Sequence, residues 1–157
     1  MTQYLENPFI WGVLPIVCSL SYNLAPGPLT FIYMGLFPAT WIAAGYYTYK
    51  SNELVKKTLL KLHIPILICY IFAVIHAVWF GMEMGFIESN NEIIGLEGSI
   101  AQNAFAPMSI AGVIEFFPRN HVMFYPTFYT SALILMFGLS YFGMAMKKNS
   151  YNIDNQE

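Results

Sequence analysis

The sequence predicts an all-α integral membrane protein, a bundle of four transmembrane helices with an outer interfacial or re-entrant helix. Of its 157 residues, 57% are hydrophobic and 10% are charged, whereas a soluble domain carries about 25% charged residues. The chain also contains apolar stretches near or above the roughly 20 residues that a helix needs to cross a bilayer. At this length we expect a single transmembrane domain, residues 1–157.

Two apolar segments at the start of the chain predict a helical hairpin. The first span is expected at residues 8–22, because Asn7 followed by Pro8 places a polar cap before a proline in the first turn. Residues 23–28 read Asn-Leu-Ala-Pro-Gly-Pro, a breaker-rich run that predicts a tight turn. The second span is expected at about residues 29–49.

The third span, residues 59–85, combines a long apolar stretch with several polar side chains. Three polar residues recur along it at intervals of seven, with two aromatic residues between them: Cys69, His76 and Glu83, with Phe72 and Trp79. This spacing places all of them on one stripe of a helix. An ionisable group in hydrocarbon costs roughly 2.5 kcal/mol or more, so we expect the stripe to face other protein or a water-filled cavity.

The histidines of this span have more than one interpretation. His76 is either a core histidine bonded to a neighbouring helix, or a metal ligand, proton carrier or substrate contact. Each seven-residue step of the stripe is a rise of about 10.5 Å, so one metal ion cannot bind two of its members directly. His63 lies thirteen residues before His76, nearly on the opposite side of the helix, and is expected at the membrane interface.

The second half of the chain predicts one more span. Residues 86–102 are polar and acidic, and the apolar run 109–117 covers only about 14 Å as a helix, too little to cross. We therefore expect an interfacial or re-entrant segment at about 101–117. The last span is predicted at about 122–146, followed by a loose polar tail, 147–157.

The lysines predict the orientation of the bundle. All six flank either the loop between the second and third spans or the C-terminal tail: Lys50, Lys56, Lys57, Lys61, Lys147 and Lys148. The opposite side holds only Arg119. The positive-inside rule therefore predicts cytoplasmic N- and C-termini. Five aromatic residues are expected in the inner interfacial belt: Trp11, Tyr46, Tyr47, Tyr49 and Tyr141.

Four side chains are candidates for a metal site in the outer half of the membrane: His76, Glu83, Glu115 and His121. Glu115 and His121 would join His76 or Glu83 if the re-entrant segment dips inward. The acids of the outer loops outnumber the one arginine there, which gives a negative field that concentrates cations. Met82 and Met84 beside Glu83 would favour copper, although filling gaps in the packing is the commoner role of methionine.

Two short runs resemble a known family. Pro118-Arg119-Asn120-His121-Val122-Met123-Phe124, opening the last span, resembles the Pro-Asn-His-x-Met-Phe stretch in C-type subunits of copper membrane monooxygenases, the ammonia and methane oxidisers. Ile75-His76-Ala77-Val78-Trp79-Phe80 is similar to the histidine-plus-aromatics segment that precedes it in that family. The resemblance implies that His76 and His121 approach one metal ion, copper in that family.

The chain departs from the family pattern at two points. The family's metal site takes an aspartate one helical turn before its first histidine, where this chain has Phe72. Its second histidine follows after thirteen residues, whereas His121 follows His76 by 45 residues. The resemblance therefore supplies two of the three ligands.

Three functions are compatible with these patterns. The first is a small integral subunit of a larger membrane-embedded complex, redox-active or copper-dependent in the manner of a monooxygenase. The second is a cation or proton transporter or channel unit that uses the track from Glu83 through His76 to Cys69. The third is a structural or assembly protein; the sequence leaves open whether the chain is an enzyme.

The expected partners follow from composition. Membrane lipid should surround the bundle, together with other integral membrane subunits or further copies of this chain. The net charge of −2 and the absence of a basic cluster in the sequence argue against nucleic acid.

Overall fold

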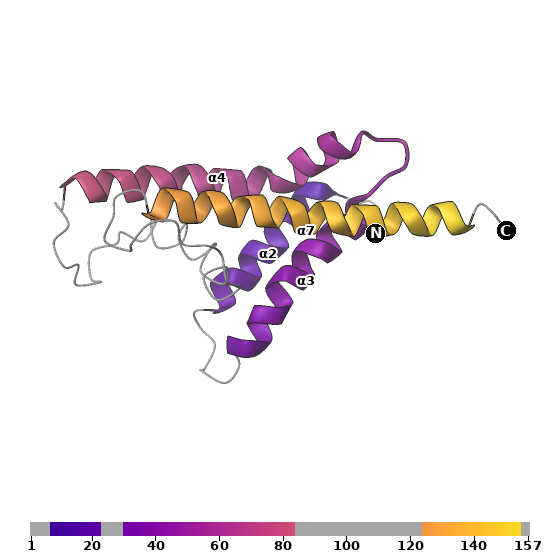
Figure 1. Ribbon diagram of the computed structural model, residues 1–157, viewed down its shortest axis with the longest axis horizontal. Helices are drawn as coiled ribbons and strands as arrows, with labels where there is room; N and C mark the ends of the chain where they lie inside the picture. Colours follow the sequence, from indigo (N-terminus) through magenta and orange to yellow (C-terminus); the bar gives the residue numbers. More distant parts are fainter. Residues whose placement is uncertain (1–6, 23–29, 84–123, 155–157) are drawn as a thin grey trace.

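The computed structural model describes residues 7–22, 30–83 and 124–154. Over these residues the chain forms four helices, in chain order α2 (Pro8–Tyr22), α3 (Thr30–Thr48), α4 (Val55–Glu83) and α7 (Phe124–Asp154). Helices α4 and α7 lie side by side along the long axis of the molecule, and the α2–α3 pair projects obliquely from them (Figure 1). α2 packs mainly against α4, and α3 packs mainly against α7. The predicted all-helical class is confirmed over the described residues.

The start of α2 follows the sequence prediction. The side-chain Oδ1 of Asn7 accepts a hydrogen bond from the backbone N–H of Phe9 at 3.0 Å. The backbone N–H of Trp11 bonds to the carbonyl of Asn7 at 3.4 Å. Asn7 therefore caps the helix that Pro8 begins, which satisfies amide groups that have no partner inside the first turn.

Helix α4 begins at Val55, four residues before the predicted span. The carbonyl of Leu54 accepts hydrogen bonds from the backbone N–H groups of Lys57 and Thr58, at 2.9 and 3.2 Å. The Thr58 hydroxyl donates to the Glu53 carboxylate at 3.2 Å. These bonds close a first turn that hydropathy alone did not indicate, because its residues are polar.

The end of α7 corrects the sequence prediction. Residues 147–154 were expected in a loose tail, but the helix continues to Asp154. The Lys147 ammonium lies 4.6 Å above the ring of Tyr46 and 5.2 Å from that of Tyr151. The rings of Tyr49 and Tyr151 lie 6.3 Å apart. Contacts with the end of α3 therefore hold the polar extension in place, and they could not be read from the local sequence.

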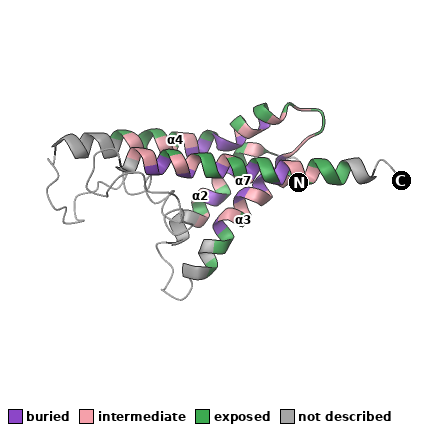
Figure 2. Cartoon of the chain, viewed as in Figure 1, coloured by how far each residue is buried: buried purple, intermediate pink, exposed green. Residues whose placement is uncertain are grey.

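Two described helices are long and apolar enough to cross a membrane, through Val55–Ile75 and Pro126–Tyr151. Pro8–Cys18 of α2 is a shorter apolar helix. Only 33% and 39% of the residues in the two long apolar windows are buried inside the chain. Figure 2 shows exposed residues along both helices. Fewer than half of the residues in either window are therefore buried by the described part of the protein.

Small residues bring the helix backbones close together. A Cβ atom on Gly12 of α2 would overlap the carbonyl oxygen of Leu62 in α4. Where α3 crosses α7, a Cβ atom on Gly45 would overlap the carbonyl of Ser140, and one on Gly143 would overlap that of Ile42. Close approach of this kind is typical of helix pairs in membranes, where packing rather than water release drives association.

The small residues of α7 differ in their surroundings. Ser140 is fully buried and Gly143 lies against α3. Gly138 faces open space. The remaining predicted elements, the acidic loop 86–102 and the interfacial segment 101–117, lie outside the described residues.

Candidate functional site

The enclosed centre of the described bundle is the imidazole of His63, which is completely buried. On one side it stacks on the indole of Trp41 in α3, with ring centroids 5.0 Å apart and an interplanar angle of 12°. On the other side it stacks on Phe137 of α7, at 3.7 Å and 12°. Three helices therefore meet in a sandwich of three parallel rings, which we call the His63 sandwich: Trp41, His63 and Phe137.

Hydrogen bonds define the state of this imidazole. Nδ1 lies 2.8 Å from the carbonyl oxygen of Leu59, one helical turn earlier. A carbonyl only accepts, so Nδ1 carries a proton and donates it. In the neutral ring Nε2 is then an acceptor, and the Ser140 hydroxyl lies 3.5 Å away, a long hydrogen bond across to α7. Both ring nitrogens thus have partners, one within α4 and one on the facing helix.

The indole of Trp41 is held differently. Its ring is completely buried, but its Nε1–H has no hydrogen-bond partner among the described residues. Phe37 contacts it edge-on, with centroids 6.5 Å apart and planes at 76°. Leaving a buried donor unpaired costs about 1–3 kcal/mol. Ring stacking and shape therefore fix the indole at the crossing of α3 with α4 and α7.

This arrangement favours packing over chemistry at His63. The described residues contain no group of three or more histidine, cysteine, aspartate or glutamate side chains that could hold a metal ion. The groups that bond to the ring are the backbone carbonyls of Leu59 and Met136 and the hydroxyl of Ser140, and none of them is an activating carboxylate or part of a metal-ligand set. The sandwich therefore fixes the register of three helices.

The sequence did not single out this site. It predicted a depth for His63, at the membrane interface, and that stays a prediction; the structure shows the neighbours of the ring, which is enclosed between α3 and α7. One signal was present. Four buried positions of α4, spaced by four, four and seven residues, lie on one face of the helix and form an inner stripe: Thr58, Leu62, Ile66 and Ala73. His63 adjoins this stripe, but the rings that enclose it come from helices whose register the sequence does not state.

The side chains of the predicted metal site lie outside those that the structure describes. His76 and Glu83 belong to α4, but their side chains are not among those described, and Glu115 and His121 lie outside the described residues. The site therefore stays a prediction. Two residues of the stripe that contains His76 and Glu83 are described, and their surroundings differ. Cys69 is half-buried against the core, whereas Phe72 is 61% exposed.

A second cluster of aromatic rings lies beyond the sandwich, at the lysine-bearing end of the helices. Trp11 stacks on Tyr47 at 5.0 Å and 13°. Tyr47 also meets Tyr46 edge-on at 5.4 Å, and Tyr46 lies under the ammonium of Lys147. Three residues expected in one interfacial belt are thus joined in space, and Lys147 lies against one of them, Tyr46.

No family model matches this chain, and neither a curated protein nor a solved structure matches it.

Proposed function

We propose that this chain is a four-span integral membrane protein with cytoplasmic termini, and that it serves as a small subunit of a larger membrane-embedded assembly. The observation that carries the proposal is the outer stripe of α4. Six exposed residues follow one another at intervals of three or four, a lysine first and then only aliphatic side chains: Lys57, Leu60, Ile64, Ile68, Ile71 and Ile75.

The outer stripe is unfavourable in water. Burying an isoleucine or leucine side chain is worth roughly 1.5–3 kcal/mol, and soluble proteins rarely expose contiguous apolar patches beyond a few hundred Å². On α7, Ile134 and Phe142 are 67% and 56% exposed, which extends the apolar surface to a second helix. Lipid or the helices of a partner would cover both faces.

The lysines support the proposed orientation. α4 and α7 run in opposite directions (Figure 1), and they meet where His63 faces Ser140. Lys56 precedes His63 by seven residues and Lys147 follows Ser140 by seven, so each lies about 10.5 Å beyond that contact by helical rise. Both therefore lie toward the same end of the bundle, the end that the positive-inside rule assigns to the cytoplasm.

The short helices support a subunit rather than a self-sufficient bundle. α2 has 15 residues and α3 has 19, lengths of about 22 and 28 Å. The hydrocarbon core is about 30 Å thick, and short apolar helices match it by thinning the bilayer or by associating with other helices. Val17 and Ile32 are more than half exposed, so the α2–α3 pair offers an apolar surface for such a neighbour.

The metal-dependent form of this proposal is copper bound by His76 and His121, with Glu83 and Glu115 nearby. Its support is the resemblance to the copper monooxygenase subunits, together with the affinity of imidazole for copper. Metal analysis of the native assembly tests it. We expect copper in the wild type and its loss in His76→Ala and His121→Ala variants that still assemble; copper-free wild-type assembly would contradict this form.

The second candidate function is an assembly role without chemistry, favoured by the His63 sandwich.

The membrane proposal is tested by extraction and labelling. We expect the protein to stay in the membrane after a carbonate wash and to co-purify with other integral proteins or with further copies of itself in mild detergent. In a variant without Cys18 and Cys69, Lys56→Cys and Lys148→Cys should react with an impermeant thiol reagent only from the cytoplasmic side. Release by carbonate would contradict the membrane assignment, and labelling of either residue from the outside would contradict the orientation.

A further inference from the structure

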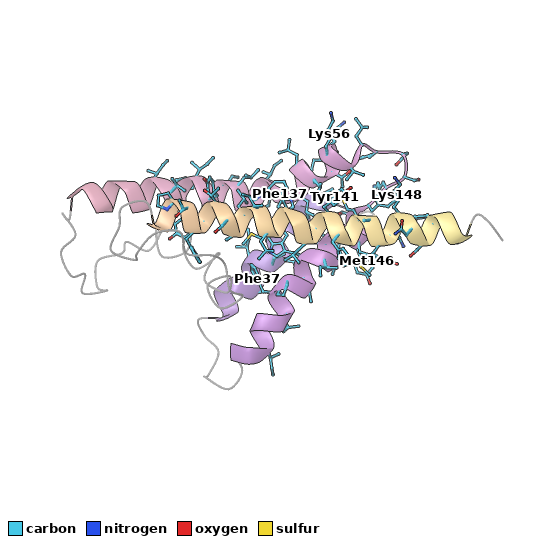
Figure 3. The ribbon with its side chains drawn as sticks, in the orientation of Figure 1. Phe37, Lys56, Phe137, Tyr141, Met146 and Lys148 are labelled. Atoms are coloured by element: carbon cyan, nitrogen blue, oxygen red, sulfur yellow. The ribbon has the colours of Figure 1, made fainter. Side chains whose placement is uncertain are left out.

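The fold gathers a basic surface that does not exist as a run in the sequence. Lysines from the start of α4 and from the end of α7 extend toward one end of the bundle, and Figure 3 shows Lys56 and Lys148 there. The described segments at this end hold six lysines against Glu53 and Asp154. Glu53 is already engaged, because its carboxylate lies 3.6 Å from the ammonium of Lys61. The surface therefore carries an excess of positive charge.

Each of the two long helices carries an exposed lysine on its outer face near this end. On α4, Lys57 is followed by Leu60 and Ile64. On α7, the exposed Lys148 lies two turns from Tyr141, which is 57% exposed, and Ile134 continues the same face. From the end inward, the order is therefore cation and then apolar side chains. It corresponds to the phosphate and the acyl chains of one phospholipid molecule.

Lys147 adds a cation whose position is set by the fold. Its ammonium lies 4.6 Å above the ring of Tyr46 and 5.2 Å from the ring of Tyr151. Contact with aromatic faces orders the lysine side chain, and the phenolic hydroxyls of tyrosine can donate hydrogen bonds to phosphate oxygens. Aromatic rings with a polar tip also prefer the headgroup level of a bilayer.

We propose that this lysine end binds anionic phospholipids of the inner leaflet, with Lys57 and Lys148 at the phosphates and the outer faces of α4 and α7 along the acyl chains. The inference rests on the proposed membrane location and adds its lipid selectivity. A lipid fits better than an acidic protein, because the lysines continue directly into apolar faces. A soluble acidic surface would leave those faces uncovered. Free phosphate would likewise contact only the cations.

The test uses the full chain purified in mild detergent from an equimolar mixture of phosphatidylglycerol and phosphatidylcholine. Native mass spectrometry then gives the ratio of the two lipids that stay bound. We expect phosphatidylglycerol to be enriched, and Lys57→Gln and Lys148→Gln each to lower its retention roughly fivefold, because a lysine near an anionic membrane surface contributes about that factor. Lys57→Arg should restore retention. Lys61→Gln is the matched control: it removes the same charge from a lysine that already pairs with Glu53.

Four results would overturn the inference. They are equal retention of the two lipids, an equal loss in Lys61→Gln, displacement of the lipid by excess inorganic phosphate, and loss of an acidic protein partner instead of lipid in Lys57→Gln. The carbonate wash separates this failure from that of the proposed function. A protein that resists the wash but shows no lipid preference refutes only the lipid selectivity, whereas a protein that the wash releases refutes the membrane location itself.

Discussion

Two faces of α4 show how one helix is divided between protein and surroundings. The inner stripe, Thr58, Leu62, Ile66 and Ala73, is completely or almost completely buried, and His63 beside it is held by two rings and by hydrogen bonds. The outer stripe from Leu60 to Ile75 is apolar and exposed. Hydrophobicity therefore does not distinguish the two faces. Shape and polar pairing do, as expected where the surroundings are as apolar as the core.

Substitution of the glycines at the helix crossings should lower the stability of the bundle most strongly. In Gly143→Leu the new side chain meets the backbone of Ile42, which cannot move aside. We expect the free energy of unfolding in detergent to fall by about 3 kcal/mol, because overpacking typically costs 1–3 kcal/mol and more where backbone is met. Denaturant titration followed by circular dichroism measures this.

The matched control is Gly138→Leu on the same helix, where the space is open. It should leave stability unchanged or raise it slightly, since leucine has a higher helix propensity than glycine. Equal destabilisation by the two substitutions would show that the α3–α7 contact is not as close as described.

The His63 sandwich should give the next largest effect. His63→Ala removes a buried ring, leaves a cavity between Trp41 and Phe137, and strands the hydroxyl of Ser140. We expect a loss of about 2–3 kcal/mol, in the range of large-to-small core substitutions, together with a changed near-ultraviolet signal from Trp41. Ile64→Ala, at the neighbouring 40% exposed position, is the control and should cost much less. If His63→Ala changed neither the stability nor the signal of Trp41, the His63 sandwich would not be the contact that fixes the three helices.

The start of α4 should give the smallest effect. Thr58→Val keeps the size of the side chain but removes the hydrogen bond to Glu53. We expect a loss of about 1 kcal/mol, the usual net contribution of one such bond.

Lys61→Gln should cost less than Thr58→Val, because the ion pair of Lys61 with Glu53 is partly exposed, with side chains 44% and 33% accessible. Thermal unfolding at low and high salt separates the two, since only the ion pair should weaken with salt.

Features set by neighbouring residues could be predicted from the sequence. Asn7 and Pro8 encode the start of α2 locally, and the structure shows the bond from Asn7 that the pattern required. The long apolar stretch around residues 59–75 likewise predicted the helix that contains it. These predictions needed only local chemistry and a length.

Features set by helix crossings could not be predicted in this way. Gly138 and Gly143 look alike in the sequence, yet only Gly143 meets another backbone. The polar end of α7 is ordered by the contact of Lys147 with Tyr46, about a hundred residues away in sequence. His63 and His76 both lie in apolar surroundings in the sequence, and only the register of α3 and α7 shows that His63 is enclosed.

The most direct test of the account places spin labels on the exposed apolar surfaces of α4 and α7, at Phe72 and Ile134. Labels at Phe72→Cys and Ile134→Cys, in a variant without Cys18 and Cys69, are examined in lipid vesicles for collision with oxygen, which dissolves in acyl chains, and with a polar nickel chelate, which stays in water. A label at Lys56→Cys is the water-exposed reference. We predict high oxygen and low nickel accessibility at Phe72 and Ile134. Nickel accessibility equal to that of the Lys56 label would contradict the placement of this face in the membrane.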